Sequence, residues 1–148
     1  MSLQCFNHIH GIEKELSLLH VAAFPEGQGW KIKDFQGLLE ISFHHILIDY
    51  NIENKIRGFL IYSVIVDEAE ILTFCVNPTE QHKGVGKGIM AAFLEEMQTK
   101  HIKTVFLEVA EDNLSAIKLY KRYGFFLNGR RLKYYDHNID ALLMAKTL

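Results

Sequence analysis

The chain has 148 residues, a hydrophobic content of 49% and two prolines, which excludes a disordered protein and predicts a single globular domain over residues 1–148. Sixteen basic and eighteen acidic residues give a formal net charge of −2, which argues against the broad basic surface of a nucleic-acid-binding protein. Two distant cysteines, no bilayer-length apolar run and no signal-peptide pattern predict a cytoplasmic protein with reduced thiols and no membrane partner.

Hydrophobic periodicity predicts six elements in the first half of the chain. The expected strands are 5–9, 44–50, 56–67 and 69–76, and the expected helices are 12–23 and 32–39. The first helix carries an apolar stripe and ends before Pro25, after which a glycine-containing loop leads to Trp30. Short polar turns join the last three strands, which are therefore expected to form an antiparallel meander.

The second half of the chain predicts two further helices and three strands. Residues Met90, Phe93, Leu94 and Met97 have the spacing of a buried helix face, and this helix is expected to end near Lys100. The strand 103–109 should run parallel to 69–76 because a helix joins them. Asn113 is predicted to cap a helix that stops at Gly124, and strands 125–132 and 140–148 flank a polar loop over 134–138. The fold class is a mixed α/β sheet in the order β-α-α-β-β-β-α-β-α-β-β.

A glycine-rich turn lies between the strand 69–76 and the following helix. Gly84 and Gly86 allow close approach to the backbone, and a helix that starts there directs amide groups at the turn. This pattern indicates an anion site, most simply for a phosphate, although a plain strand-to-helix turn would also use glycines. The dinucleotide fingerprint fails because Ile89 occupies its third glycine position, and the nucleotide-triphosphate loop fails because Gln81 occupies its first.

The remaining pattern is Gln81-x-x-Gly84-x-Gly86. It resembles the pyrophosphate loop of the GNAT N-acetyltransferases, in which loop amides hold the diphosphate of coenzyme A. Later motifs extend the resemblance. They are the run Leu107-Glu108-Val109, then Asn113, and then Ala116, Leu119-Tyr120 and Gly124-Phe125. The order of these motifs is similar to that in the RimI-type ribosomal-protein N-terminal alanine acetyltransferases. The likeness covers essentially the whole chain and is strongest after Asp67.

The resemblance implies the GNAT fold, acetyl-CoA as cofactor and a set of contacting residues. The implied coenzyme-binding residues are Phe74, Cys75, Val76, Gln81, His82, Lys83, Gly84, Val85, Gly86, Lys87, Asn113, Ala116 and Tyr120. The implied substrate-binding residues are Phe24, Trp30, Glu108, Tyr134 and Tyr135. Each has a simpler alternative: Asn113 could only cap its helix, the lysines could be solvated, and the aromatic residues could be core or turn residues.

The chemistry of amine acetylation explains three of these positions. The attacking amine must be neutral, so a carboxylate at a strand end can take its proton, and Glu108 is the candidate general base. The family places a general acid at the position of Tyr120, and the Val76 backbone N–H is the implied donor to the oxyanion. If the family resemblance is set aside, the simplest interpretation is that Glu108 is a solvated surface charge and Tyr120 is a core residue.

The chain departs from the family pattern around the expected acceptor groove. Extra glycines follow Pro25, Ala110 replaces a common arginine, no proline follows Tyr135, and the segment before Asp140 is short. The predicted reaction is direct transfer of acetyl from acetyl-CoA to a protein N-terminal α-amine, with a ribosomal protein as one candidate acceptor. A small-molecule amine or a lysine side chain is the alternative acceptor. A monomer or weak homodimer is expected.

Two other function classes remain open. A non-catalytic CoA-binding regulatory module would keep the glycine-rich turn but would lack catalytic activity. The presence of both Glu108 and Tyr120 argues against such a module. A dinucleotide-dependent oxidoreductase draws support from an acidic residue about 20 positions past the turn, but Ile89 counts against it. The pairs His8-x-His10 and His44-His45 lack further ligands, so no metal is predicted.

Overall fold

The computed structural model describes residues 2–6, 11–135 and 138–148, which form seven strands and four α-helices in the predicted order. The strands are β1 (Ser2–Phe6), β2 (His44–Tyr50), β3 (Ile56–Ile65), β4 (Glu68–Val76), β5 (Thr104–Ala110), β6 (Phe126–Tyr135) and β7 (Ile139–Thr147). The helices are α1 (Glu13–Ala23), α2 (Ile32–Leu39), α3 (Val85–Thr99) and α4 (Leu114–Arg122), and a short 3-10 helix, η1 (Pro78–Glu80), precedes α3.

Most predicted elements are confirmed, but several of their ends are wrong. The strand expected over 56–67 ends as β3 at Ile65, because Val66 adopts a left-handed φ of 58° and turns the chain. The loop expected over 134–138 begins later, because β6 continues to Tyr135, which pairs with Ile139. The strand expected over 5–9 is β1 and lies earlier in the sequence. Residues 7–9 of that expectation, and residues 136–137 of the loop, lie outside the described residues.

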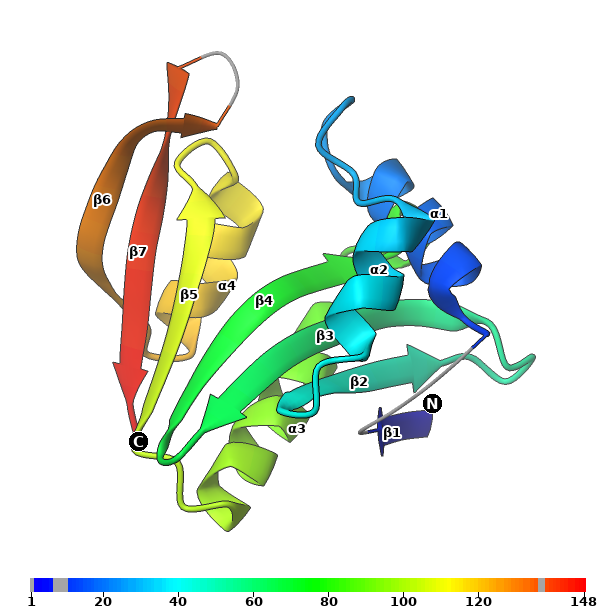
Figure 1. The fold of residues 1–148 in the computed structure, drawn as a ribbon, viewed down its shortest axis with the longest axis horizontal. Helices are drawn as coiled ribbons and strands as arrows, with labels where there is room; N and C mark the ends of the chain where they lie inside the picture. The colour runs from blue at the N-terminus through cyan, green and yellow to red at the C-terminus, as the bar shows by residue number, and fades with distance from the viewer. Residues whose placement is uncertain (1, 7–10, 136–137) are drawn as a thin grey trace.

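The strands form one seven-stranded sheet in the order β1-β2-β3-β4-β5-β7-β6. The predicted meander of β2, β3 and β4 is antiparallel, and β4 and β5 are parallel, as expected from the helix between them. β7 lies between β5 and β6, which makes β6 an edge strand (Figure 1). The sequence predicted the number of strands here but not this insertion.

The parallel strands β4 and β5 pair over only four residues each. The register runs from Glu68 opposite Thr104 to Ile71 opposite Leu107, and beyond it the two strands diverge (Figure 1). The register between β3 and β4 shifts at the same point, so that Leu72 has no partner on β3. We call this divergence the β4–β5 fork; it comprises residues 72–76 of β4 and 108–110 of β5.

Two apolar cores cover the two faces of the sheet. Helices α3 and α4 lie behind the sheet and α1 and α2 lie in front of it in Figure 1. The predicted α3 face is confirmed, since Met90, Phe93 and Met97 are fully buried in the rear core and Leu94 packs against it partly buried. That core also contains Leu107 and Val109, so it continues from β4 to β5 across the fork. Among the described helices, none combines the length and apolarity that a membrane crossing requires.

Candidate active site

The predicted anion-binding turn leads directly into α3. Gly84 is the N-cap and has a φ of 83°, a left-handed conformation that favours glycine. A Cβ at Gly84 would meet no atom within 4 Å, so the turn is open on this side. The helix begins with a bond from Gly88 N to Gly84 O at 3.0 Å. The amides of residues 85–87 therefore have no acceptor within the helix and point out of its positive end.

The start of α3 packs at the β4–β5 fork. A Cβ on Gly86 would lie 3.6 Å from the Val76 side chain and 3.7 Å from both Leu119 and Phe74. The turn is tied to β4 by Gln81, whose Nε2 donates to Val76 O over 3.5 Å. The structure thus places Phe74, Val76, Gln81, Gly84 and Gly86 near one another, and their contact with a coenzyme stays a prediction. Cys75 lies between Phe74 and Val76 but belongs to the front core.

The backbone of Val76 points into the fork. Asn77 N donates to Arg57 O on β3 at 2.7 Å, and Val76 is paired with Gly58 in the same register. Backbone groups alternate in direction along an antiparallel strand, so the N–H of Val76 points away from β3. At this position β5 has already diverged from β4. The Val76 amide is therefore placed to donate to a ligand in the fork.

The charged and imidazole side chains around the turn are exposed. His82, Lys83 and Lys87 all lie on the surface, and Lys83 Nζ is 3.5 Å from the Glu80 carboxylate. The carbonyl of Lys87 accepts a hydrogen bond of 3.1 Å from the Tyr123 hydroxyl, which links α3 to the end of α4. Exposed cations beside an amide-lined turn can move to meet an anion.

Helix α4 forms the rear wall of the fork. Asn113 caps it as predicted, since its Oδ1 accepts from Ala116 N at 3.3 Å. One turn further on, the Tyr120 side chain is 6% exposed. Its ring packs edge-on against Phe74 of β4 at 6.4 Å and against Phe125 at 5.7 Å. Tyr120 is thus both a core residue and a neighbour of the β4 segment that borders the fork.

Glu108 lies on β5 just beyond the last residue paired with β4. Its neighbours Leu107 and Val109 are buried in the rear core, so the Glu108 side chain points to the front face. It is 26% exposed, and Oε1 forms an ion pair of 3.0 Å with Arg131 Nη2 of β6. Glu108 and Tyr120 therefore lie on opposite faces of the sheet. Both can reach the same reacting group only if that group lies in the fork between them.

The predicted substrate residues Phe24 and Trp30 pack around a buried histidine. The ring of His20, which is 2% exposed, stacks on Phe24 at 4.1 Å and on Trp30 at 4.9 Å. Trp30 N donates to His20 Nδ1 at 3.0 Å, so the ring proton lies on Nε2, which donates to Thr73 Oγ1 at 2.9 Å. Ser17 Oγ donates to Trp30 O at 2.7 Å. These bonds fasten the loop between α1 and α2 to β4 beside the fork.

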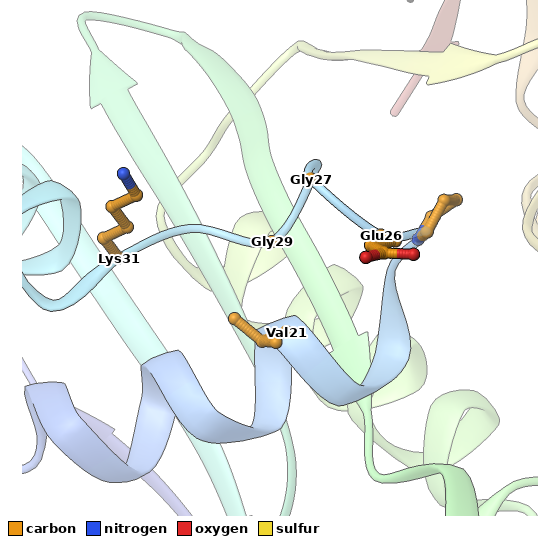
Figure 2. Close-up of a pocket in the computed structure, with 6 residues that line it drawn as sticks. Val21, Glu26, Gly27, Gly29 and Lys31 are labelled. Carbon is orange, nitrogen blue, oxygen red and sulfur yellow. The ribbon is translucent and has the colours of Figure 1, made fainter.

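The α1–α2 loop also encloses a surface cavity of about 410 Å³, which is shown in Figure 2. Its lining residues are Val21, Pro25, Glu26, Gly27, Gly29 and Lys31. A Cβ on Gly29 would lie 2.6 Å from the Val21 Cα, so only glycine allows the loop to lie this close to α1. The Glu26 and Lys31 side chains project at opposite ends of the loop in this view. The extra glycines noted in the sequence thus shape a wall of this cavity.

The burial of His20 predicts an acid-sensitive fold. Burial lowers the pKa of His20 from 6.5 to about 4, while the Asp34 carboxylate opposes this shift to a smaller extent. Because the folded protein holds the neutral form, this stability is present above pH 6.5 and is lost as the pH falls through 4. At about 1.4 kcal/mol per pKa unit, we expect a loss of about 3 kcal/mol across this range. Urea unfolding at several pH values measures it.

The variant His20→Gln is the control for this prediction, because glutamine stays neutral at every pH in the range. It should be less stable than the wild type at pH 7, where it lacks the ring stacking. Its stability should then fall less between pH 6.5 and 4, since the carboxylates titrate in both proteins but the imidazole does not. Equal losses in the two proteins would contradict the role of His20.

The β6–β7 hairpin carries the other predicted substrate residues. Tyr134 is 56% exposed, and the Arg131 guanidinium carbon lies 5.5 Å from its ring centroid. The backbone of Tyr135 pairs with Ile139, whereas its side chain lies outside the described part of the structure. Tyr134 is therefore joined through Arg131 to Glu108, a connection that no sequence pattern indicated.

The described residues provide no obvious covalent acetyl carrier or metal centre. Cys75 is 2% exposed, and burial raises the pKa of its thiol to about 12, which keeps it protonated and unreactive. In the described ranges, no three His, Cys, Asp or Glu side chains gather closely enough to hold a metal ion. His8 and His10, and the side chain of Cys5, lie outside those ranges.

Sequence reasoning missed two residues that organise the site. His20 had a detectable signal, because it lies on the buried side of α1 beside Leu16 and Leu19, where a polar residue requires hydrogen-bond partners. Arg131 had none, since its contact with Glu108 depends on the position of β6 next to β7. His20 connects the α1–α2 loop to β4, and Arg131 connects β6 to Glu108 of β5.

Comparison with known proteins finds relatives of this chain in sequence and in fold. Residues 9–125 match the model of the Acetyltransferase (GNAT) family. The [ribosomal protein bS18]-alanine N-acetyltransferase of Escherichia coli K12 is 34% identical over 126 residues, which cover 83% of this chain and 81% of that protein. The protein of the same name from Haemophilus ducreyi is 32% identical over 146 residues, covering 96% and 93%.

Solved structures show the same architecture. The ribosomal-protein-S18-alanine N-acetyltransferase from Escherichia coli superposes with a TM-score of 0.85 and 24% identity, covering 99% of this chain and 94% of that chain. A chain of the NatC complex bound to Gag peptide and CoA superposes with a TM-score of 0.76 and 20% identity, covering 100% and 99%. At these identities, the structures establish the fold.

Proposed function

This chain belongs to the GNAT acetyltransferase family and is an acetyl-CoA-dependent N-acetyltransferase, and we propose that its acceptor is the α-amine of a protein N-terminus. Ribosomal protein bS18 is the first candidate. The observation that carries this proposal is the 34% identity to a curated bS18-alanine N-acetyltransferase over 83% of the chain. We further propose that the chain acts as a single domain in the cytoplasm, where ribosomal proteins are made.

The turn at the start of α3 fits the diphosphate of coenzyme A. It offers amides at a positive helix end, and the space beside Gly84 is empty of side chains. Gln81, Gly84, Val85, Gly86 and Lys87 would hold the phosphates, with His82 and Lys83 at the rim. Phe74, Val76, Asn113, Ala116 and Tyr120 would line the path into the fork. When bound, acetyl-CoA supplies the acetyl group as a thioester.

The residues around the fork can then perform three tasks. Glu108 takes the proton that the α-ammonium must lose before its nitrogen forms the new amide bond. The Val76 N–H donates to the carbonyl oxygen as negative charge develops on it. The Tyr120 hydroxyl gives a proton to the sulfur as the carbon–sulfur bond breaks. Transfer is direct, which is supported by the buried and protonated thiol of Cys75.

The acceptor is proposed to lie on the front face, between the α1–α2 loop and the β6–β7 hairpin. Phe24 and Trp30 shape the first wall through their stacking on His20, and Tyr134 stands on the second. Glu108 points to this face, so an amine entering between the two walls would meet its carboxylate. Tyr135 is proposed to join the second wall.

A peptide panel tests the acceptor proposal. We expect a bS18 N-terminal peptide with a free α-amine to be acetylated with a kcat/KM about tenfold or more above that of a peptide blocked at its N-terminus but carrying lysine. Release of free coenzyme A thiol, with mass spectrometry to locate the acetyl group, measures both. Preference for the lysine or for a small amine would reject a protein N-terminus as the acceptor.

A further inference from the structure

A single arginine joins the candidate base to the candidate acceptor hairpin. Arg131 Nη2 lies 3.0 Å from Glu108 Oε1, and the same guanidinium group lies beside the ring of Tyr134. The Arg131 side chain is 54% exposed, whereas that of Glu108 is 26% exposed. The contact thus fixes a half-buried carboxylate from the solvent side.

The hairpin that carries Arg131 is itself held in place by a second ion-pair cluster. Arg130 Nη1 binds Glu111 Oε2 at 2.7 Å and Asp140 Oδ2 at 2.8 Å. Asp140 Oδ1 accepts from Lys133 N at 2.8 Å, and this bond together with Arg130 lowers the pKa of Asp140. These contacts connect β5, β6 and β7 next to Glu108. Arg130 thus holds the hairpin in place, and the neighbouring Arg131 instead contacts Glu108.

We propose that Arg131 is a positioning residue for acetyl transfer. It holds the Glu108 carboxylate through Oε1 and balances the negative charge of that carboxylate. The acceptor amine can then bind without its protonated ammonium form being strongly stabilised. This inference rests on the proposed function of Glu108. Two physical effects support it. A planar guanidinium holds a carboxylate in a defined orientation, which leaves Oε2 for the proton from the amine. A neutral ion pair also attracts an ammonium less than a lone carboxylate does.

The second effect gives a kinetic signature that simple structural support would not produce. In Arg131→Met, the unbalanced Glu108 should hold the protonated acceptor more tightly but position its own carboxylate poorly. We expect kcat to fall about tenfold or more, while the KM for the peptide stays the same or falls. The KM for acetyl-CoA should not change. Arg131→Lys keeps the charge but not the planar group, and should recover part of the lost kcat.

The matched control is Arg122→Met, which removes an exposed arginine from the last turn of α4 and changes the net charge equally. Its kinetic constants should match those of the wild type. A peptide KM that rises in Arg131→Met, or a kcat that does not fall, would overturn the proposal. Circular dichroism of each variant checks that it is folded.

A double-mutant cycle separates this inference from the proposed function itself. In the Glu108→Gln background, Arg131→Met should have little further effect on the residual kcat, because its target is gone. Additive losses would show that Arg131 acts elsewhere and would overturn the proposal. If instead the wild-type protein acetylates no N-terminal peptide, the proposed function fails first. If it does so and Glu108→Gln retains full activity, the assignment of the base fails.

Discussion

Replacing Glu108 by glutamine should lower kcat by about 10²–10⁴-fold, the usual contribution of a positioned general base. Glutamine has nearly the same shape but cannot accept the proton from the acceptor ammonium. Because Glu108 faces the front of the sheet, away from the turn before α3, the Kd for acetyl-CoA should change little. Steady-state kinetics with an N-terminal peptide and calorimetry with acetyl-CoA measure the two quantities.

Glu111→Gln provides a matched control for this substitution. Glu111 follows β5 directly and also pairs with an arginine of β6, but its partner is Arg130. Its replacement removes one carboxylate from the same region and should leave kcat within a few-fold of the wild-type value. Undiminished turnover in Glu108→Gln at every pH would show that the base is a different group.

Gly84→Val should weaken acetyl-CoA binding about 10- to 100-fold. A β-branched residue avoids the φ of 83° that Gly84 adopts, so the turn must rearrange and its amides must move. Loss of one charge-assisted hydrogen bond to a phosphate costs about 1.5–3 kcal/mol, which corresponds to this range of affinity. Calorimetric titration with acetyl-CoA and with free coenzyme A measures the effect.

The chain contains a closely matched control for backbone strain. Gly27 in the α1–α2 loop also has a φ of 83°, and a Cβ there would also meet no atom within 4 Å. Gly27→Val and Gly84→Val should therefore lose similar amounts of stability. Only Gly84→Val should lose affinity for coenzyme A. Equal affinity in the two variants would place the diphosphate away from the turn before α3.

The sequence predicted those features that depend on local pattern. The α3 face was predicted because Met90, Phe93 and Met97 recur with helical spacing, and all three are buried. Asn113 was predicted as a cap because a short amide side chain there can accept from the helix, and its Oδ1 does so. The turn around Gly84 was predicted because two glycines before a helix allow a ligand to approach the backbone, and Gly84 adopts a left-handed φ of 83° that favours glycine.

Features that depend on distant parts of the chain could not be predicted in this way. Periodicity marks a strand but not its neighbours, so the insertion of β7 between β5 and β6 was missed. The ion pair between Glu108 and Arg131 follows from that insertion. The expected end of β3 was wrong because nothing in the apolar composition of Val66 indicates a left-handed turn.

The short pairing of β4 with β5 also determines how the two parts of the sheet are held together. Four residue pairs join them, and beyond these the two strands are connected through the rear core, by side chains such as Val109, Val85 and Ile117. The separation of the two strands is therefore set by side-chain volume rather than by backbone hydrogen bonds. Adding or removing methyl groups in that core would widen or narrow the fork without altering the fold. We therefore expect conservative substitutions in that core to change the size of the acyl group that the fork admits.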